Sequence, residues 1–279
     1  MTVALGIHGV GNLRPGSTAA QASAALGTAW AAFLSTRLTS PLPEGEVPVA
    51  YYADLLDANE RQGAGEDPDQ FDPATAKAIL AWARQYNIAP EEDAQGRATA
   101  PLRWIVDRIA SKLDLDQGSA RSFVARFFPE VLTYLHNGDT KGKVETVVAK
   151  AIGRYRPRVV LAHSLGSVIA YETLWAHREL TVDVLVTLGS PLAMPNVVFE
   201  HLYRDCSNSR GRPPGVRTWI NFADPGDPVA VPPRLSDQFS GLAVDSTATI
   251  GAFAFHSAKG YLSHPATATA VAPYLTLPS

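Results

Sequence analysis

Short, mainly apolar segments recur along the chain, and each ends close to a glycine or a polar residue. Segments of roughly four to eight apolar residues are typical of strands that are covered on both faces. The predicted strands are residues 3–7, 47–52, 159–162, 182–188, 216–222 and 250–255. Because strands of this kind belong to parallel sheets, the pattern predicts a mostly parallel sheet of about six strands.

Between these segments, apolar residues recur every three or four positions, which is the spacing of one face of a helix. The predicted helices are residues 18–38, 74–86, 102–113, 120–135, 144–155 and 167–175, and a terminal helix opens at His264. Strands that alternate with helices predict an α/β fold with a doubly wound sheet. With 279 residues, 46% of them hydrophobic, the chain can bury a core. We expect one domain spanning residues 1–279.

The stretch of roughly residues 55–138 departs from this alternation. An ordinary crossover between parallel strands needs about a dozen residues, so most of this stretch is predicted to be a helical insertion before the strand at 159–162. Such an insertion commonly lies over the carboxyl end of the sheet as a cap that shapes a substrate pocket. Its aromatic residues are candidates for the pocket wall, although aromatic residues at helical spacing more often belong to the core. They are Trp82, Tyr86, Trp104, Phe127 and Phe128.

A tight turn separates the strand at 159–162 from the helix at 167–175. Only His163, Ser164 and Leu165 remain to reverse the chain, and the small residues Ala162 and Gly166 flank the turn. A turn this tight places the serine in a strained conformation at the carboxyl end of the strand. Ser164 is therefore a candidate nucleophile, whereas the neighbouring His163 is expected to point away from it.

The segment Ala-His-Ser-Leu-Gly resembles the G-x-S-x-G nucleophile elbow of the α/β-hydrolase superfamily, lipases and esterases in particular, with Ala162 in the first glycine position. The resemblance implies a minimal α/β-hydrolase fold that lacks the usual N-terminal hairpin. The turn His-Gly-Val-Gly-Asn at residues 8–12 is similar to the oxyanion loop of that superfamily, which implies that the N–H groups of Val10 and Leu165 form the oxyanion hole. The segment at 187–192 is similar to a strand end that faces the site in these relatives, so Ser190 is expected to be a pocket neighbour.

The other two members of a catalytic triad, an acid and a base, are expected to follow later strands of the sheet. Asp224 and Asp227 both follow the strand at 216–222, and the superfamily pattern favours Asp227 as the acid. His256 follows the segment 250–255, and a Tyr-Leu pair a few residues later favours it over His264 as the base. The order Ser164, Asp227, His256 is that of the superfamily. Each residue follows a predicted parallel strand, so the three are expected to meet at one edge of the sheet.

Other classes of function receive little support. A net charge of −3 with scattered arginines provides no basic surface for nucleic acid. The other histidines show no metal-ligand spacing, and the expected chemistry requires neither a metal nor a cofactor. A single cysteine, Cys206, suits a reducing compartment. With neither a signal peptide nor a membrane-spanning segment in the sequence, we expect a cytoplasmic protein.

Together these features predict a serine hydrolase that cleaves a small carboxylic ester through an acyl-enzyme intermediate. Acyl transfer, thioester cleavage or amide cleavage on the same triad remain alternatives, as does a binding protein that keeps the fold without activity.

Overall fold

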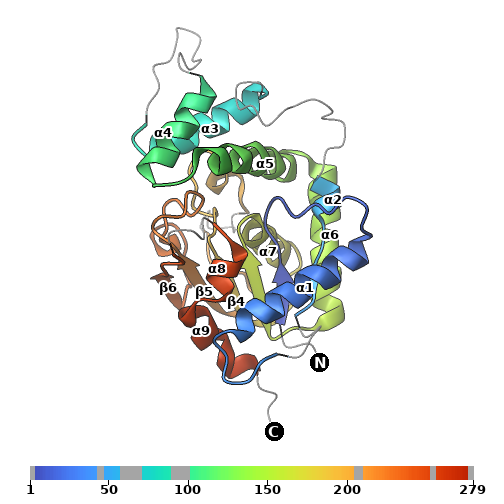
Figure 1. Cartoon of the computed structure of the whole chain (residues 1–279). Helices are drawn as coiled ribbons and strands as arrows, with labels where there is room; N and C mark the ends of the chain where they lie inside the picture. Colours follow the sequence, from blue (N-terminus) through green and yellow to red (C-terminus); the bar gives the residue numbers. More distant parts are fainter. Residues whose placement is uncertain are drawn as a thin grey trace.

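The computed structural model describes residues 4–42, 47–56, 71–88, 101–203, 210–251 and 256–275. One sheet of six parallel strands, in the order β2-β1-β3-β4-β5-β6, crosses the molecule (Figure 1). The strands are β1 (Ala4–Ile7), β2 (Val49–Ala50), β3 (Val159–His163), β4 (Val182–Leu188), β5 (Val216–Ala223) and β6 (Val244–Thr247). The predicted α/β fold with a parallel sheet is confirmed.

The last strand of the described sheet is not the one that the sequence predicts. The sheet ends with β6 at Val244–Thr247 instead of residues 250–255, of which 252–255 lie outside the described residues. β6 is the edge strand, and its residues are exposed or half-buried. Because such an edge strand needs no apolar residues, it leaves no hydrophobic signal in the sequence.

The register of the strands aligns their carboxyl ends. Ile7 of β1 pairs with Ala162 of β3, His163 pairs with Leu188 of β4, and Leu188 pairs with Phe222 of β5. Residues that directly follow these strands therefore emerge at one edge of the sheet, as the chemistry expected from the sequence requires.

Helices cover both faces of the sheet. They are α1 (Ala19–Ser35), α2 (Ala53–Leu56), α3 (Pro73–Gln85), α4 (Leu102–Lys112), α5 (Gln117–His136), α6 (Gly138–Tyr155), α7 (Leu165–Ala176), α8 (Ala258–Leu262) and α9 (Pro265–Leu275). Along β3, Val159 and Leu161 pack into a core with α1, α8 and α9, whereas Val160 and Ala162 pack into the core shared with α3 to α7. None of the helices in the described part of the chain is long and apolar enough to cross a membrane.

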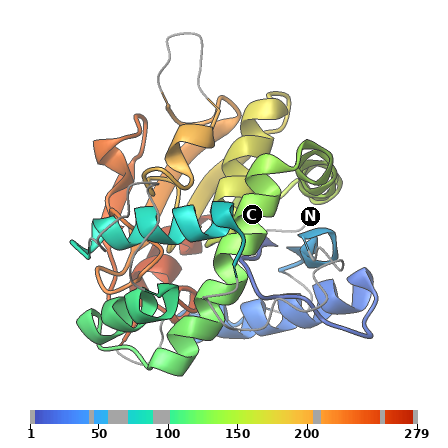
Figure 2. The same cartoon turned by 90° about the horizontal axis from the view of Figure 1, so that it is seen from above.

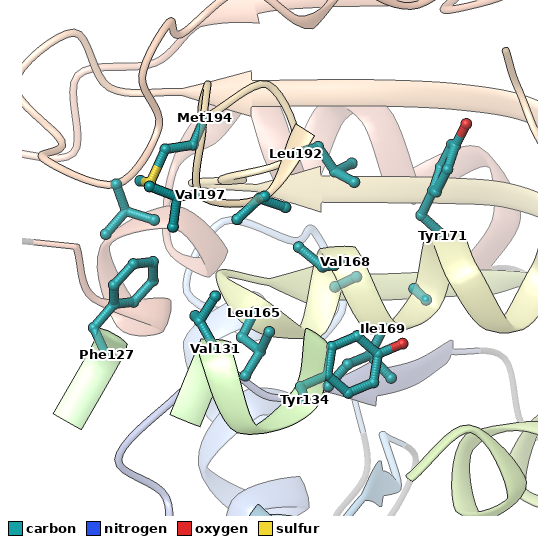
Figure 3. Close-up of a cluster of buried hydrophobic side chains, with 14 of the residues drawn as sticks. Phe127, Val131, Tyr134, Leu165, Val168, Ile169, Tyr171, Leu192, Met194 and Val197 are labelled. Atoms are coloured by element: carbon teal, nitrogen blue, oxygen red, sulfur yellow. The ribbon is translucent and has the colours of Figure 1, made fainter. Parts of the chain in front are cut away.

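Helices α3, α4 and α5 come from the stretch predicted to be an insertion, and they lie together beyond one end of the sheet (Figure 1). Seen from above, they lie over the rest of the molecule (Figure 2). α5 is packed against α7 through a buried apolar cluster (Figure 3). The labelled members are Phe127, Val131 and Tyr134 of α5, Leu165, Val168, Ile169 and Tyr171 of α7, and Leu192, Met194 and Val197 after β4. Burial of each large apolar side chain contributes about 1.5–3 kcal/mol, so the cluster holds α5 firmly against the turn at Ser164.

Candidate active site

Ser164 lies in the sharp turn between β3 and α7. Its φ of 55° and ψ of −131° lie in a region that residues with a side chain rarely adopt, and strain of this kind is typical of functional sites. Three hydrogen bonds hold the turn. The Ser164 N–H donates to the carbonyl of Leu188 at 3.0 Å, and the carbonyl of Ser164 accepts from Ser167 N at 2.9 Å and from Ser167 Oγ at 2.6 Å.

Two glycines make room for this turn. A Cβ atom on Gly166 would lie 2.3 Å from the carbonyl oxygen of Ile7, so only glycine lets α7 start this close to the end of β1. A Cβ atom on Gly9 would lie 2.5 Å from Cβ of Ser164. The loop after β1 and the serine turn are therefore in direct contact.

Ser190 stabilises the turn through its hydroxyl group. Its Oγ lies 2.6 Å from Oγ of Ser167 and accepts a hydrogen bond from the N–H of Leu192 at 3.3 Å. The sequence predicts Ser190 as a pocket neighbour, but its hydroxyl is buried in this bracing network.

Asp227 and His256 form a buried pair. Nδ1 of His256 lies 2.7 and 2.8 Å from the two carboxylate oxygens of Asp227, and the side chains are 2% and 0% exposed. The carboxylate also accepts from the Tyr261 hydroxyl at 2.7 Å and from the Val229 N–H at 2.8 Å. Burial alone would raise the pKa of Asp227, but the charge and hydrogen bond of His256 and these two donors outweigh it. The pKa therefore lies below its ordinary value, and the group is a carboxylate.

Gly189 allows this pair to assemble. It follows β4 with a φ of +54°, and a Cβ atom there would lie 2.7 Å from Oδ2 of Asp227 and 2.7 Å from Cε2 of Tyr261. Because glycine carries no side chain, the carboxylate and the phenol can both reach the end of β4.

Ser164 and His256 line one cavity of about 290 Å³. With Nδ1 donating to Asp227, the lone pair of the imidazole is on Nε2, where a general base needs it. Neither His256 Nε2 nor Ser164 Oγ has a hydrogen-bond partner among the described residues, and the two atoms do not bond to each other. Catalytic hydrogen bonds are often loose in enzymes without substrate and tighten when it binds.

Val10 and Leu165, whose N–H groups are predicted to form the oxyanion hole, flank the serine turn in different ways. Val10 lines the cavity, and the loop that carries it is held by the Asn12 side chain, which donates to the carbonyls of Gly9 at 2.9 Å and Val10 at 3.1 Å. Leu165 is the first residue of α7, where an N–H group has no acceptor within the helix. The N-terminus of that helix also carries a partial positive charge, which favours an anion.

His8 serves the fold. Its Nδ1 donates to the carbonyl of Gly9 at 2.8 Å, and its Nε2 accepts from the N–H of Tyr52 at 3.3 Å. Its ring stacks on that of Tyr52 with centroids 4.1 Å apart, and the Tyr52 hydroxyl donates to the His8 carbonyl. Burial lowers the pKa of His8 to about 4, so the ring is neutral.

The alternative acid and base lie outside this arrangement. Asp224 accepts from the N–H groups of Gly226 and Ile250, each at 2.7 Å, and so stabilises the turn after β5. His264 accepts from the N–H of Ala266 at 3.1 Å at the start of α9.

One face of α5 forms the opposite wall of the cavity. Its lining residues are Ser119, Ser122, Phe123 and Arg126, and the ring of Phe123 packs edge-on against His256 at 5.3 Å. Sequence reasoning missed these residues, although their spacing of three, four and seven positions is that of one helix face. The five aromatic candidates from the sequence are not among the residues that line the cavity. For example, Trp82 is buried and donates to the carbonyl of Pro228, whereas Trp104 is 46% exposed.

His163 is the other residue that sequence reasoning misplaced. Instead of pointing away, it lines the cavity, and its ring centroid lies 4.8 Å from that of His256. A second imidazole therefore stands beside the serine.

No cluster of three or more histidine, cysteine, aspartate or glutamate residues in the described ranges is arranged to hold a metal ion. Comparison with known proteins adds nothing to this description, because no family model, curated protein or solved structure matches the chain. The site combines a strained serine with an imidazole that is paired with a carboxylate, and both the serine and the imidazole line one cavity.

Proposed function

We propose that the protein is a serine hydrolase of the α/β-hydrolase type that cleaves a carboxylic ester through an acyl-enzyme. The main support is the buried Asp227–His256 pair, whose free ring nitrogen shares a cavity with the strained Ser164. A serine hydroxyl hardly ionises near neutral pH and needs such a base. The six-stranded parallel sheet is compatible with a minimal form of this fold.

The reaction has two halves. In the first, Oγ of Ser164 attacks the ester carbonyl while Nε2 of His256 takes the hydroxyl proton, and the same proton then passes to the departing alcohol. In the second, His256 removes a proton from water, which attacks the acyl-enzyme, and the proton returns to Ser164 as the acid leaves. Asp227 holds the imidazole in the required tautomer and stabilises its protonated form.

The N–H groups of Val10 and Leu165 would stabilise the negative oxygen of each tetrahedral intermediate. One such donor is worth roughly 3 kcal/mol in the transition state. The reaction needs no cofactor. The single cysteine in the chain suits the cytoplasm as the place of activity.

A fluorophosphonate probe combined with a p-nitrophenyl ester series tests the proposal. We expect the probe to label the wild-type protein at Ser164, and Ser164→Ala to lose both the label and ester turnover. Ser111→Ala is the matched control, because this serine on α4 is exposed and its hydroxyl donates within its own helix, to the carbonyl of Asp107. The proposal is wrong if the wild-type protein neither reacts with the probe nor hydrolyses any ester of the series.

A further inference from the structure

The imidazole of His163 is the most unusual group in the site that the proposed reaction does not use. The residue ends β3 directly before Ser164, is 6% exposed, and lines the same cavity. Its ring is tilted by 30° against the ring of His256 at 4.8 Å between centroids. Any substrate that reaches Ser164 must therefore pass close to this ring.

The two ring nitrogens of His163 differ in their surroundings. The ring makes a hydrogen bond to the backbone of His256, whereas Nε2 is buried and has no partner within the described part of the chain. The bond to the backbone is therefore made by Nδ1. Since the bond raises the proton affinity of the ring, Nδ1 is its donor and carries the proton, which leaves a lone pair on Nε2.

The ring stays neutral, so this lone pair persists. Burial lowers the pKa of His163 well below its ordinary value, and the nearby His256 lowers it further. The charge of Asp227 and the backbone hydrogen bond act in the opposite direction but are weaker. His163 is thus a buried hydrogen-bond acceptor at the nucleophile, and a buried acceptor of this kind favours any ligand that brings a donor.

We infer that His163 is a substrate-binding residue whose Nε2 accepts a hydrogen bond from an O–H or N–H group of the substrate. This inference rests on the proposed ester hydrolysis and narrows its substrate class. The preferred substrate is a small polar ester with a donor close to the scissile bond, such as a hydroxyacyl ester or an ester of a polyol.

The rest of the cavity combines polar with apolar groups. Across from His163, α5 contributes the polar residues Ser119, Ser122 and Arg126, with Phe123 as its aromatic member. The volume of about 290 Å³ lies at the small end of the range for ligand sites.

Matched ester pairs that differ by one hydroxyl test the inference. On the acyl side the pair is p-nitrophenyl 3-hydroxybutyrate and p-nitrophenyl butyrate, and on the alcohol side it is 2-hydroxyethyl butyrate and propyl butyrate. We expect the wild-type protein to prefer the hydroxylated ester of at least one pair by roughly tenfold in kcat/KM. In His163→Phe, which keeps an aromatic ring but has no acceptor, that ratio should fall to about one. In His163→Gln, whose side-chain oxygen can accept, part of the preference should return.

Within each variant, the ratio of kcat/KM for the hydroxylated ester to kcat/KM for its plain partner separates this inference from the proposed function. Turnover of plain butyrate esters reports the triad, whereas the hydroxyl preference reports His163. Equal kcat/KM for both members of both pairs in the wild-type protein would overturn the inference and leave the hydrolase intact. An unchanged preference in His163→Phe would also overturn it. Labelling of Ser164 by a fluorophosphonate verifies that each variant is folded, and His163→Met replaces His163→Phe if the latter does not fold.

Discussion

The hydroxyl of Tyr261 bonds to both ends of the turn that carries the two aspartates. It donates to Oδ2 of Asp227 at 2.7 Å and accepts from the backbone N–H of Asp224 at 2.9 Å. Burial and the neighbouring charge of Asp227 raise the pKa of Tyr261, so the phenol keeps its proton and remains a donor. The substitution Tyr261→Phe removes one oxygen atom and leaves the ring in place.

The size of the effect follows from these contacts. A hydrogen bond to a charged group contributes about 1.5–3 kcal/mol, so we expect Tyr261→Phe to lower the free energy of unfolding by that amount. The carboxylate keeps its bonds to His256 and to the N–H of Val229, so the catalytic pair should survive. Loss of the Asp side-chain charge in a triad lowers kcat by roughly 10⁴-fold. Tyr261→Phe keeps that charge and only loosens the position of the Asp227 carboxylate, so it should lower kcat far less, by about tenfold.

The pH profile distinguishes a positioning role from a merely structural one. Without the phenol, more negative charge is concentrated on Oδ2 of Asp227, which favours the protonated form of His256. Because the base acts only when neutral, the acidic limb of kcat/KM should move to higher pH, by up to about one unit. The lowered pKa of Asp227 contributes stability that is present above the unfolded pKa and lost as pH falls through the folded value. Acid unfolding of Tyr261→Phe should therefore begin at higher pH.

The assay is p-nitrophenyl ester hydrolysis between about pH 4.5 and 9, together with urea unfolding at the same pH values. Tyr51→Phe is the matched control, because the Tyr51 hydroxyl accepts from the backbone N–H of Arg14 at 3.1 Å. The control should leave the acidic limb unchanged. An acidic limb in Tyr261→Phe that stays in place, or moves to lower pH, would refute this reasoning about Asp227.

Three further predictions follow from single contacts. Gly166→Ala should lower the free energy of unfolding, measured in urea, by about 3 kcal/mol or more, because the new Cβ atom would lie 2.3 Å from the carbonyl oxygen of Ile7 in β1. Gly142→Ala in helix α6 should instead raise the free energy of unfolding by roughly 0.5–1 kcal/mol, because its Cβ atom would meet no other atom within 4 Å. Asp227→Asn should lower kcat for a p-nitrophenyl ester by roughly 10⁴-fold and Asp224→Asn by less than about tenfold, and the reverse order would exchange their roles. Burial lowers the pKa of His8 from 6.5 to about 4, so the neutral ring is favoured in the folded protein. The stability that this neutral ring contributes is fully present above pH 6.5 and declines as pH falls towards 4. Between pH 6.5 and 4, the free energy of unfolding in urea should therefore fall less in His8→Gln than in the wild-type protein, by up to roughly 3 kcal/mol. The same pH dependence of this free energy in His8→Gln and in the wild-type protein would contradict this account.

Much of the fold was readable because strands buried on both faces need apolar residues. β4 lies at the predicted residues, and β3 and β5 extend the predicted strands by one residue each. The edge strand β6 escaped detection because its exposed residues carry no such requirement. Helix α8, with five residues, is too short for a periodic pattern to reveal it.

The site was readable only where its chemistry is local. Ser164 can be proposed from its own turn, because the small residues around it are needed for that turn and leave a mark in the sequence. The roles of Asp224 and Asp227 cannot be separated locally, since both follow β5 in a polar turn. The direction of the His163 ring and the wall formed by α5 depend on how distant segments pack, and sequence reasoning missed both.

The order of amino acids by itself determined the α/β class, the strand ends at which polar groups emerge, and the strained serine, because each depends on residues close together in the chain. The tertiary structure decided which aspartate faces the imidazole of His256, and it placed the second imidazole of His163 and a face of α5 around the same cavity. Those arrangements depend on contacts between residues tens of positions apart, and such contacts form only when the sheet and its covering helices pack together.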